Sequence, residues 1–147
     1  MIVERILPAA RKRLIIVGDN APLIAAARLL RDMDADLIVV HDRDGMLAGV
    51  ITKTDIVRQI SHCAGASCMA GATAVMTKAV VSCHPGDLFR DVWSLMKEKH
   101  LKNIPILDQE SRPIGVLNAR DALEAMLGEV EYEEDLLREY VMCVGYH

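Results

Sequence analysis

Apolar and polar positions along the first part of the chain follow two distinct periods. Short apolar runs bounded by turn residues are typical of buried strands. Longer stretches in which apolar side chains recur every three or four residues are typical of helices with one buried face. A short turn between two of the runs predicts an antiparallel hairpin. The predicted order is strand, helix, strand, strand and helix, over residues 14–17, 22–33, 37–40, 46–51 and 52–60.

The same order returns farther along the chain. A constant offset of 66 residues carries Gly49 to Gly115 and Asp55 to Asp121. Because chance would not hold this register through five elements, the pattern indicates an internal duplication. We expect an α/β fold of two β-α-β-β-α repeats, packed sheet against sheet about a pseudo-twofold axis, since one half alone buries too little surface. The second set of elements is predicted at residues 79–82, 88–99, 104–107, 114–117 and 119–127.

The segments outside the repeats carry separate predictions. Residues 2–7 are expected to form a short helix that stops near Pro8, and the basic residues 11–13 to lead as a solvated segment into the first strand. The small residues of 61–75 are compatible with a loop or with a short packed helix. The predicted domains are the first repeat, a linker, the second repeat, and a C-terminal helix with tail, at residues 8–61, 62–75, 76–127 and 128–147.

Residues 130–141 predict an acidic amphipathic helix. Its apolar stripe consists of Tyr132, Leu136, Leu137, Tyr140 and Val141. The stripe either packs on its own repeat or forms an interface between two subunits. The second interpretation predicts a homodimer.

Composition limits the classes of function. The net charge of −4 and the pI near 5.7 argue against a general nucleic-acid binder, which needs a basic surface. No apolar run approaches the roughly 20 residues of a membrane span, and the N-terminal residues lack a signal-like apolar region. We therefore expect a cytoplasmic protein without a membrane partner, whose four cysteines are reduced thiols.

Cysteines and histidines offer a function from another class. His62, Cys63, Cys68, Cys83 and His84 would have to gather into a soft-metal or redox site. The spacing Cys63-x4-Cys68 is longer than the Cys-x2-Cys pairs typical of zinc sites, and cysteines in small-residue stretches are usually packing residues. The five histidines have no evident partner nucleophile, so we expect no enzymatic activity and no required cofactor.

One motif closes each repeat, at residues 49–55 and 115–121. It contains a glycine, an apolar strand, a helix-capping Thr or Asn, and an aspartate three residues later. The capping residue and the acid resemble a capping box, so a purely structural role is one interpretation. The other is a nucleotide site, because glycine lets a ligand approach, a helix N-terminus attracts an anion, and an aspartate can accept hydrogen bonds from both hydroxyls of a ribose.

The duplicated Gly-h-h-[Thr/Ser/Asn]-x-x-Asp pattern resembles a tandem pair of cystathionine-β-synthase (CBS) domains, also called a Bateman module, over about residues 8–127. The chain is most similar to stand-alone members of that family. The resemblance implies clefts between the repeats for AMP, ADP, ATP or S-adenosylmethionine. It also implies a regulatory ligand rather than a cofactor, dimers that meet through helices, and an unidentified protein partner that reads the ligand state. The alternative is a dimerisation module without ligand.

Carried over position by position, the resemblance implies two sites. The first contains Thr52 and Asp55 for the ribose, Thr54 near the phosphates, and Ala10, Ile15 and Ala35 against the base. The second contains Asp121 and Asn118 for the ribose, Arg120 and Lys102 for phosphate, and Met76, Val81 and Leu101 against the base.

The two implied sites differ in charge. Lys102 stands where the first repeat has Asp36, and Arg120 stands where it has Thr54. These cations favour phosphate in the second cleft, although Asn118 departs from the usual hydroxyl. We therefore expect a phosphorylated adenosine ligand at Asp121, with the first cleft weaker, empty or selective for a less charged ligand.

Overall fold

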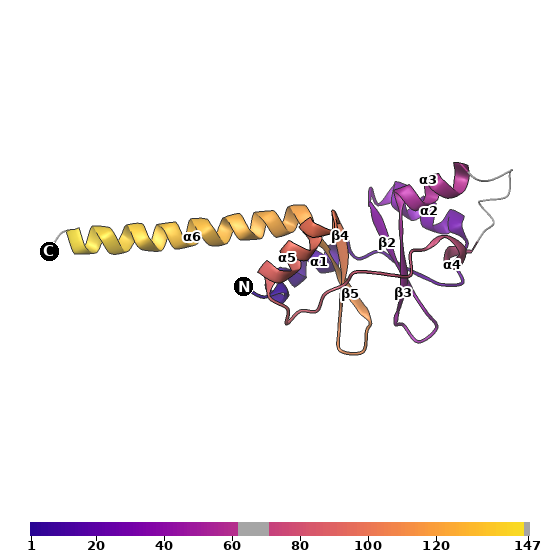
Figure 1. Cartoon of the computed structure of the whole chain (residues 1–147), viewed down its shortest axis with the longest axis horizontal. Coiled ribbons are helices and arrows are strands. Elements are labelled where there is room, and N and C mark those ends of the chain that lie inside the picture. The colour runs from indigo at the N-terminus through magenta and orange to yellow at the C-terminus, as the bar shows by residue number, and fades with distance from the viewer. Residues whose placement is uncertain (62–70, 146–147) are drawn as a thin grey trace.

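The computed structural model describes residues 1–61 and 71–145, with side chains described up to residue 139. Figure 1 shows the two repeats side by side, with the last helix extending away from them. The elements in chain order are η1 (Val3–Ile6), α1 (Leu7–Arg13), β1 (Ile16–Gly18), α2 (Leu23–Asp32), β2 (Leu37–His41), β3 (Leu47–Thr52), α3 (Lys53–Ser61), α4 (Ala72–Val75), α5 (Phe89–Glu98), β4 (Asn103–Leu107), β5 (Pro113–Asn118) and α6 (Ala119–Gly145).

The first repeat contains a sheet of order β1-β2-β3. β1 pairs with β2 in parallel, and β2 pairs with β3 as the predicted antiparallel hairpin. The turn of this hairpin includes Gly45 at φ +83°, a backbone conformation that glycine adopts without strain. In the second repeat β4 and β5 form the equivalent hairpin. The prediction of a duplicated α/β fold is confirmed.

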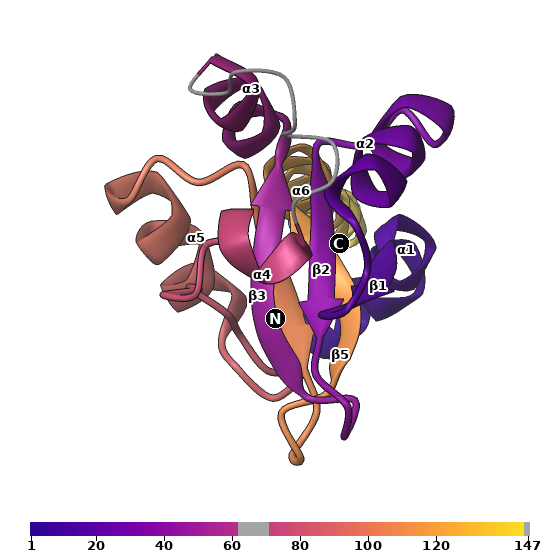
Figure 2. The same ribbon diagram turned by 90° about the vertical axis from the view of Figure 1, so that its right-hand side faces the viewer.

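The two faces of each hairpin bury different cores, because successive side chains of a strand point to opposite sides. Ile38, Val40 and Ile51 pack beneath α2 and α3. A shared cluster joins the two sheets and consists of Leu37, Val39, Val50 and Val116. Figure 2 shows β2 and β3 in front of β5 along this direction. The apolar run 37–40 is therefore buried on both faces, as its composition predicts.

Helix α1 packs on the second repeat, although it precedes the first in sequence. Ala10 belongs to the core cluster that also contains Ile104 and Leu117. A methyl group added at Gly115 would lie 3.0 Å from Ala10 Cβ, so the glycine allows the backbones to approach. Met76, which lies 66 residues after Ala10, packs on Gly49 in the same way. The segment before each repeat therefore packs on the other repeat.

The short helix predicted over residues 2–7 is present as η1, which ends at Ile6, but the chain does not leave helical structure at Pro8 because α1 follows directly. Pro8 lies in the first turn of α1, where its missing N–H would have no helical partner in any case. The basic residues 11–13 are the last turn of this helix rather than a solvated lead into a strand. Cations at that end favour the helix, because they oppose the negative pole of its dipole.

The strand predicted at residues 79–82 is also absent from the described part of the second repeat. The backbone turns at this point, because the Val80 N–H donates to the Lys78 carbonyl at 3.0 Å. A single parallel bridge between Cys83 and Ile106 replaces the strand. The second sheet is therefore smaller than the predicted three strands.

Helix α6 joins two helices that the sequence predicts as separate. It runs without interruption through Gly128 from Ala119 to Gly145. Tyr132, Leu136 and Leu137 of the predicted stripe are exposed, so this part of the stripe does not pack on its own repeat. The side chains of Tyr140 and Val141 lie outside the described residues. Across 1–61 and 71–145, no helix combines the length and hydropathy needed to cross a membrane.

Candidate ligand-binding site

The first motif forms the corner between β3 and α3. The Asp55 carboxylate Oδ2 accepts a hydrogen bond from the Thr52 backbone N–H at 2.9 Å, and Thr52 Oγ1 accepts one from the Asp55 backbone N–H at 3.2 Å. This reciprocal pair is a capping box, as the spacing of Thr52 and Asp55 predicts. Asp55 is 8% exposed, and its second oxygen lies 3.8 Å from Arg58 Nη1.

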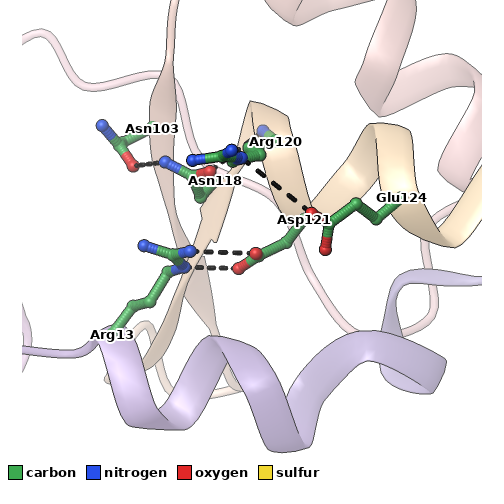
Figure 3. A network of polar contacts seen from close by, with 6 residues as sticks. All are labelled: Arg13, Asn103, Asn118, Arg120, Asp121 and Glu124. Carbon is green, nitrogen blue, oxygen red and sulfur yellow. Dashed lines mark hydrogen bonds and ion pairs between the residues drawn. The ribbon is translucent and has the colours of Figure 1, made fainter.

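The second motif, between β5 and α6, uses its polar groups differently. Asn118 Oδ1 accepts from the Arg120 backbone N–H at 2.9 Å, and Asn118 Nδ2 donates to Asn103 Oδ1 at 2.8 Å. The Asp121 carboxylate accepts two hydrogen bonds from Arg13 of α1, one from Nε and one from Nη2 at 2.9 Å. Figure 3 shows this guanidinium facing both carboxylate oxygens. The ion pair raises the pKa of Arg13 above its ordinary value.

A cavity of about 440 Å³ opens beside the first motif. Thr52, Thr54 and Asp55 line one side. The other side comes from the second repeat and the segment before it, and includes Ala79, Val81, Leu101, Lys102 and Ile104. The cavity therefore lies between the repeats and combines two carboxylates, threonine hydroxyl groups, an apolar wall and two lysines, with Asp36 and Lys53 completing the charged groups.

A smaller cavity of about 170 Å³ lies beside the second motif. Arg13, Ile15, Ala35 and Asn118 are among the residues that line it. Asp121 is not among the described residues that line this cavity, because its carboxylate points toward Arg13.

The two apolar walls are exchanged relative to the sequence-based assignment. Val81, Leu101 and Lys102 lie with Asp55, whereas Ile15 and Ala35 lie with Asn118. The reason is the approximate twofold packing, which faces each motif with the opposite repeat. The sequence-based assignment places each apolar wall beside the motif of its own repeat, whereas in the structure each wall faces the motif of the other repeat.

Three further positions differ from their implied roles. Among the described residues, Ala10 and Met76 line neither cavity, because they pack against Gly115 and Gly49. The Arg120 side chain is 84% exposed, its Nε lies 3.9 Å from Glu124 Oε1, and it lines neither cavity. Figure 3 shows it directed toward Glu124.

Sequence reasoning missed Arg13, although the duplication contains a signal for it. Position 13 corresponds to position 79 at the 66-residue offset, and position 79 is alanine. A cation in one copy and a methyl group in the other marks an asymmetry between the two clefts. Lys53 and His100, which also line the larger cavity, were not singled out either.

The cysteine and histidine cluster is only partly within the described residues. His62, Cys63 and Cys68 lie outside them. Cys83 is buried, and burial raises the pKa of its thiol from 9.0 to about 12, which keeps the thiol protonated at neutral pH and makes it a poor ligand or nucleophile. Within 1–61 and 71–139, no group of three His, Cys, Asp or Glu side chains is arranged to hold a metal ion.

Comparison with known proteins covers both repeats. The sequence profile of the family described as CBS domain matches residues 3–62 and 72–128. An uncharacterised protein of Methanocaldococcus jannaschii is 26% identical, over 79% of this chain and 88% of that protein. The CBS-domain-containing protein ATU1752 of Agrobacterium tumefaciens has a TM-score of 0.73 at 25% identity, over 86% of this chain and 99% of that one. The CBS domain pair of protein MJ0100, solved with 5′-methylthioadenosine and S-adenosyl-L-methionine, has a TM-score of 0.74 at 22% identity, over 88% and 98%.

Proposed function

This chain belongs to the CBS-domain family, and on that premise we propose that it is a regulatory module that binds an adenosine nucleotide in the cavity beside Asp55. The observation that carries the proposal is the composition of this 440 Å³ cavity. It is a binding role rather than a catalytic one, and we place it in the cytoplasm. The ligand state would be passed to a protein partner through a change in the arrangement of the two repeats.

Asp55 suits the ribose. One carboxylate oxygen is used by the Thr52 N–H, which fixes the orientation of the side chain. The other lies beyond hydrogen-bond distance of Arg58, so it is available to a ribose hydroxyl. The similar CBS pair solved with two adenosine compounds supports the same ligand class.

The remaining walls suit the base and the phosphates. Val81, Leu101 and Ile104 offer an apolar surface to adenine. Lys102 offers a cation to phosphate, whereas Lys53 is partly neutralised because its Nζ lies 3.4 Å from Asp36. The sequence favours the Asp121 cleft for phosphate, but Lys102 belongs to the other cavity. We therefore propose Asp55 as the primary site.

Calorimetry with AMP, ADP, ATP and S-adenosylmethionine tests the proposal. Lys102→Gln should weaken ATP binding about tenfold and leave S-adenosylmethionine, which has no phosphate, almost unchanged. Asp55→Asn should weaken all four ligands, and Asp121→Asn, at the equivalent position, is the matched control. The proposal is wrong if no ligand binds the native chain, or if only Asp121→Asn reduces binding.

We also propose that α6 forms a homodimer with a second copy of the chain. Four of its exposed apolar side chains follow the spacing of a heptad repeat, with Glu134 at the remaining core position, and they are Leu123, Leu127, Val130 and Leu137. Tyr132 and Leu136 are also exposed but lie outside this repeat. In a parallel pair of helices, Glu133 of one copy would face Arg138 of the other, and these charges are opposite. The sequence also predicts a subunit interface on this helix, but the heptad shares Leu137 with the predicted stripe and leaves Tyr132 and Leu136 outside its core.

A further inference from the structure

We infer that Arg13 closes the second nucleoside cleft of this chain by occupying the aspartate that a ribose would need. The inference rests on the proposed function, since it assumes that the Asp55 cleft takes an adenosine ligand. It concerns stoichiometry: one ligand is bound per chain, although the duplicated sequence contains two motifs.

The ion pair uses both oxygens of Asp121. Arg13 Nε and Nη2 donate to Oδ2 and Oδ1, a bidentate geometry that engages both oxygens and turns the carboxylate toward α1, where vicinal hydroxyl groups would have to compete with the guanidinium. The equivalent Asp55 keeps one oxygen available. The Asp121 side chain is 18% exposed, so the pair is partly shielded from water on the carboxylate side.

The duplication places alanine at the position of this arginine in the other copy. Ala79 lines the 440 Å³ cavity beside Asp55, whereas Arg13 lines the 170 Å³ cavity beside the second motif. The guanidinium occupies space in the smaller cleft and pairs with its aspartate, whereas the methyl group of Ala79 is smaller and forms no such pair in the larger one. The clefts also differ at positions 36/102, 52/118 and 54/120, but of these residues only Arg13 donates side-chain hydrogen bonds to a motif aspartate.

Helix α1 holds Arg13 at this place. Arg13 is the last residue of α1, and Ala10, one turn earlier, is buried against Gly115 of the same repeat. The backbone beneath the guanidinium is thus anchored on the strand that leads into the second motif. Because the Arg13 side chain itself is 43% exposed, we expect the closure to weaken with added salt.

Calorimetric stoichiometry tests the inference with AMP as the probe. The native chain should bind one AMP, Arg13→Ala should bind two, and Ala79→Arg, which installs the equivalent arginine in the cleft beside Asp55, should bind none. Lys12→Ala is the matched control, because Lys12 lines the same small cavity and its substitution leaves the Asp121 ion pair intact. The new site in Arg13→Ala should be at least about tenfold tighter than any second site of the native chain.

The possible results separate the two proposals. If the native chain binds two AMP molecules, or if Arg13→Ala still binds one, the closure by Arg13 is refuted and the Asp55 site stands. If neither protein binds AMP, the closure by Arg13 is refuted, and the Asp55 site fails with it only if ADP, ATP and S-adenosylmethionine do not bind the native chain either. Thermal unfolding of each variant confirms that a lost site is not a lost fold, and Arg13→Lys, which keeps the charge without the bidentate geometry, should behave between the native chain and Arg13→Ala.

Discussion

Ala10 of α1 lies directly on Gly115 of β5, so that a methyl group added at the glycine would be 3.0 Å from Ala10 Cβ. This contact joins the segment before the first repeat to the second repeat. Its counterpart at Gly49 is tighter, because an added methyl group would lie 2.7 Å from the Thr77 backbone carbonyl oxygen. The motif glycines therefore hold the two repeats together, in addition to any role beside a ligand.

Gly115→Ala should destabilise the protein by about 1–3 kcal/mol, because α1 would have to move away from β5 to admit the methyl group. Gly49→Ala should cost at least as much, since a backbone carbonyl cannot move aside as a side chain can. Urea unfolding measures both. Gly86→Ala is the control, because an added methyl group there meets no atom within 4 Å, and equal stability losses at all three positions would contradict the interpretation.

The buried thiol of Cys83 should make stability depend on alkaline pH. Burial raises its pKa in the folded protein from 9.0 to about 12, so the folded state holds the proton more tightly than the unfolded state. This contribution to stability is fully present below pH 9 and is lost as the pH rises toward 12. Chemical unfolding at pH 8 and pH 10.5 should show a smaller loss for Cys83→Ala than for the native chain.

The accessibility of the same thiol provides an independent check. In a Cys63→Ser, Cys68→Ser, Cys143→Ser variant, Cys83 is the remaining cysteine of the sequence. Alkylation with iodoacetamide at pH 8 should be slow in buffer and fast in denaturant, because the thiol is 2% exposed in the fold. Rapid reaction of the folded variant would contradict both the burial and the raised pKa.

The proposed dimer through α6 predicts opposite effects of two substitutions. Glu134→Leu should strengthen self-association, because it replaces a charge at a core position of the heptad with an apolar side chain. Leu137→Glu should abolish it, since Leu137 is 65% exposed in the single chain and has no role in its core. Sedimentation equilibrium measures both, and Tyr132→Glu, away from the heptad core, is the control. A native chain that stays monomeric at high concentration would refute the proposal.

Much of the fold is predictable from local patterns. The hairpins over 37–51 and 104–117, helices α2 and α5 and the duplicated motif all follow from spacing that can be read within one segment. The capping box of Thr52 and Asp55 is equally local, because its members are three residues apart. The predictions at Pro8 and at 79–82 differ from the structure because a proline can end a helix or begin one, and a short apolar run can form a strand or a turn. Packing on the other repeat selected the conformation.

By itself, therefore, the sequence determined the duplication, the order of elements and the chemistry available at each motif, because these depend on residue types at short range. Only the tertiary structure decided which wall faces which motif. The pairing of Arg13 with Asp121, 108 residues apart, and the position of Lys102 beside Asp55 follow from the twofold packing of the repeats. Because the chain is duplicated, the sequence alone does not tell whether a wall faces the motif of its own repeat or that of the other repeat. Side-chain packing between the sheets decides this.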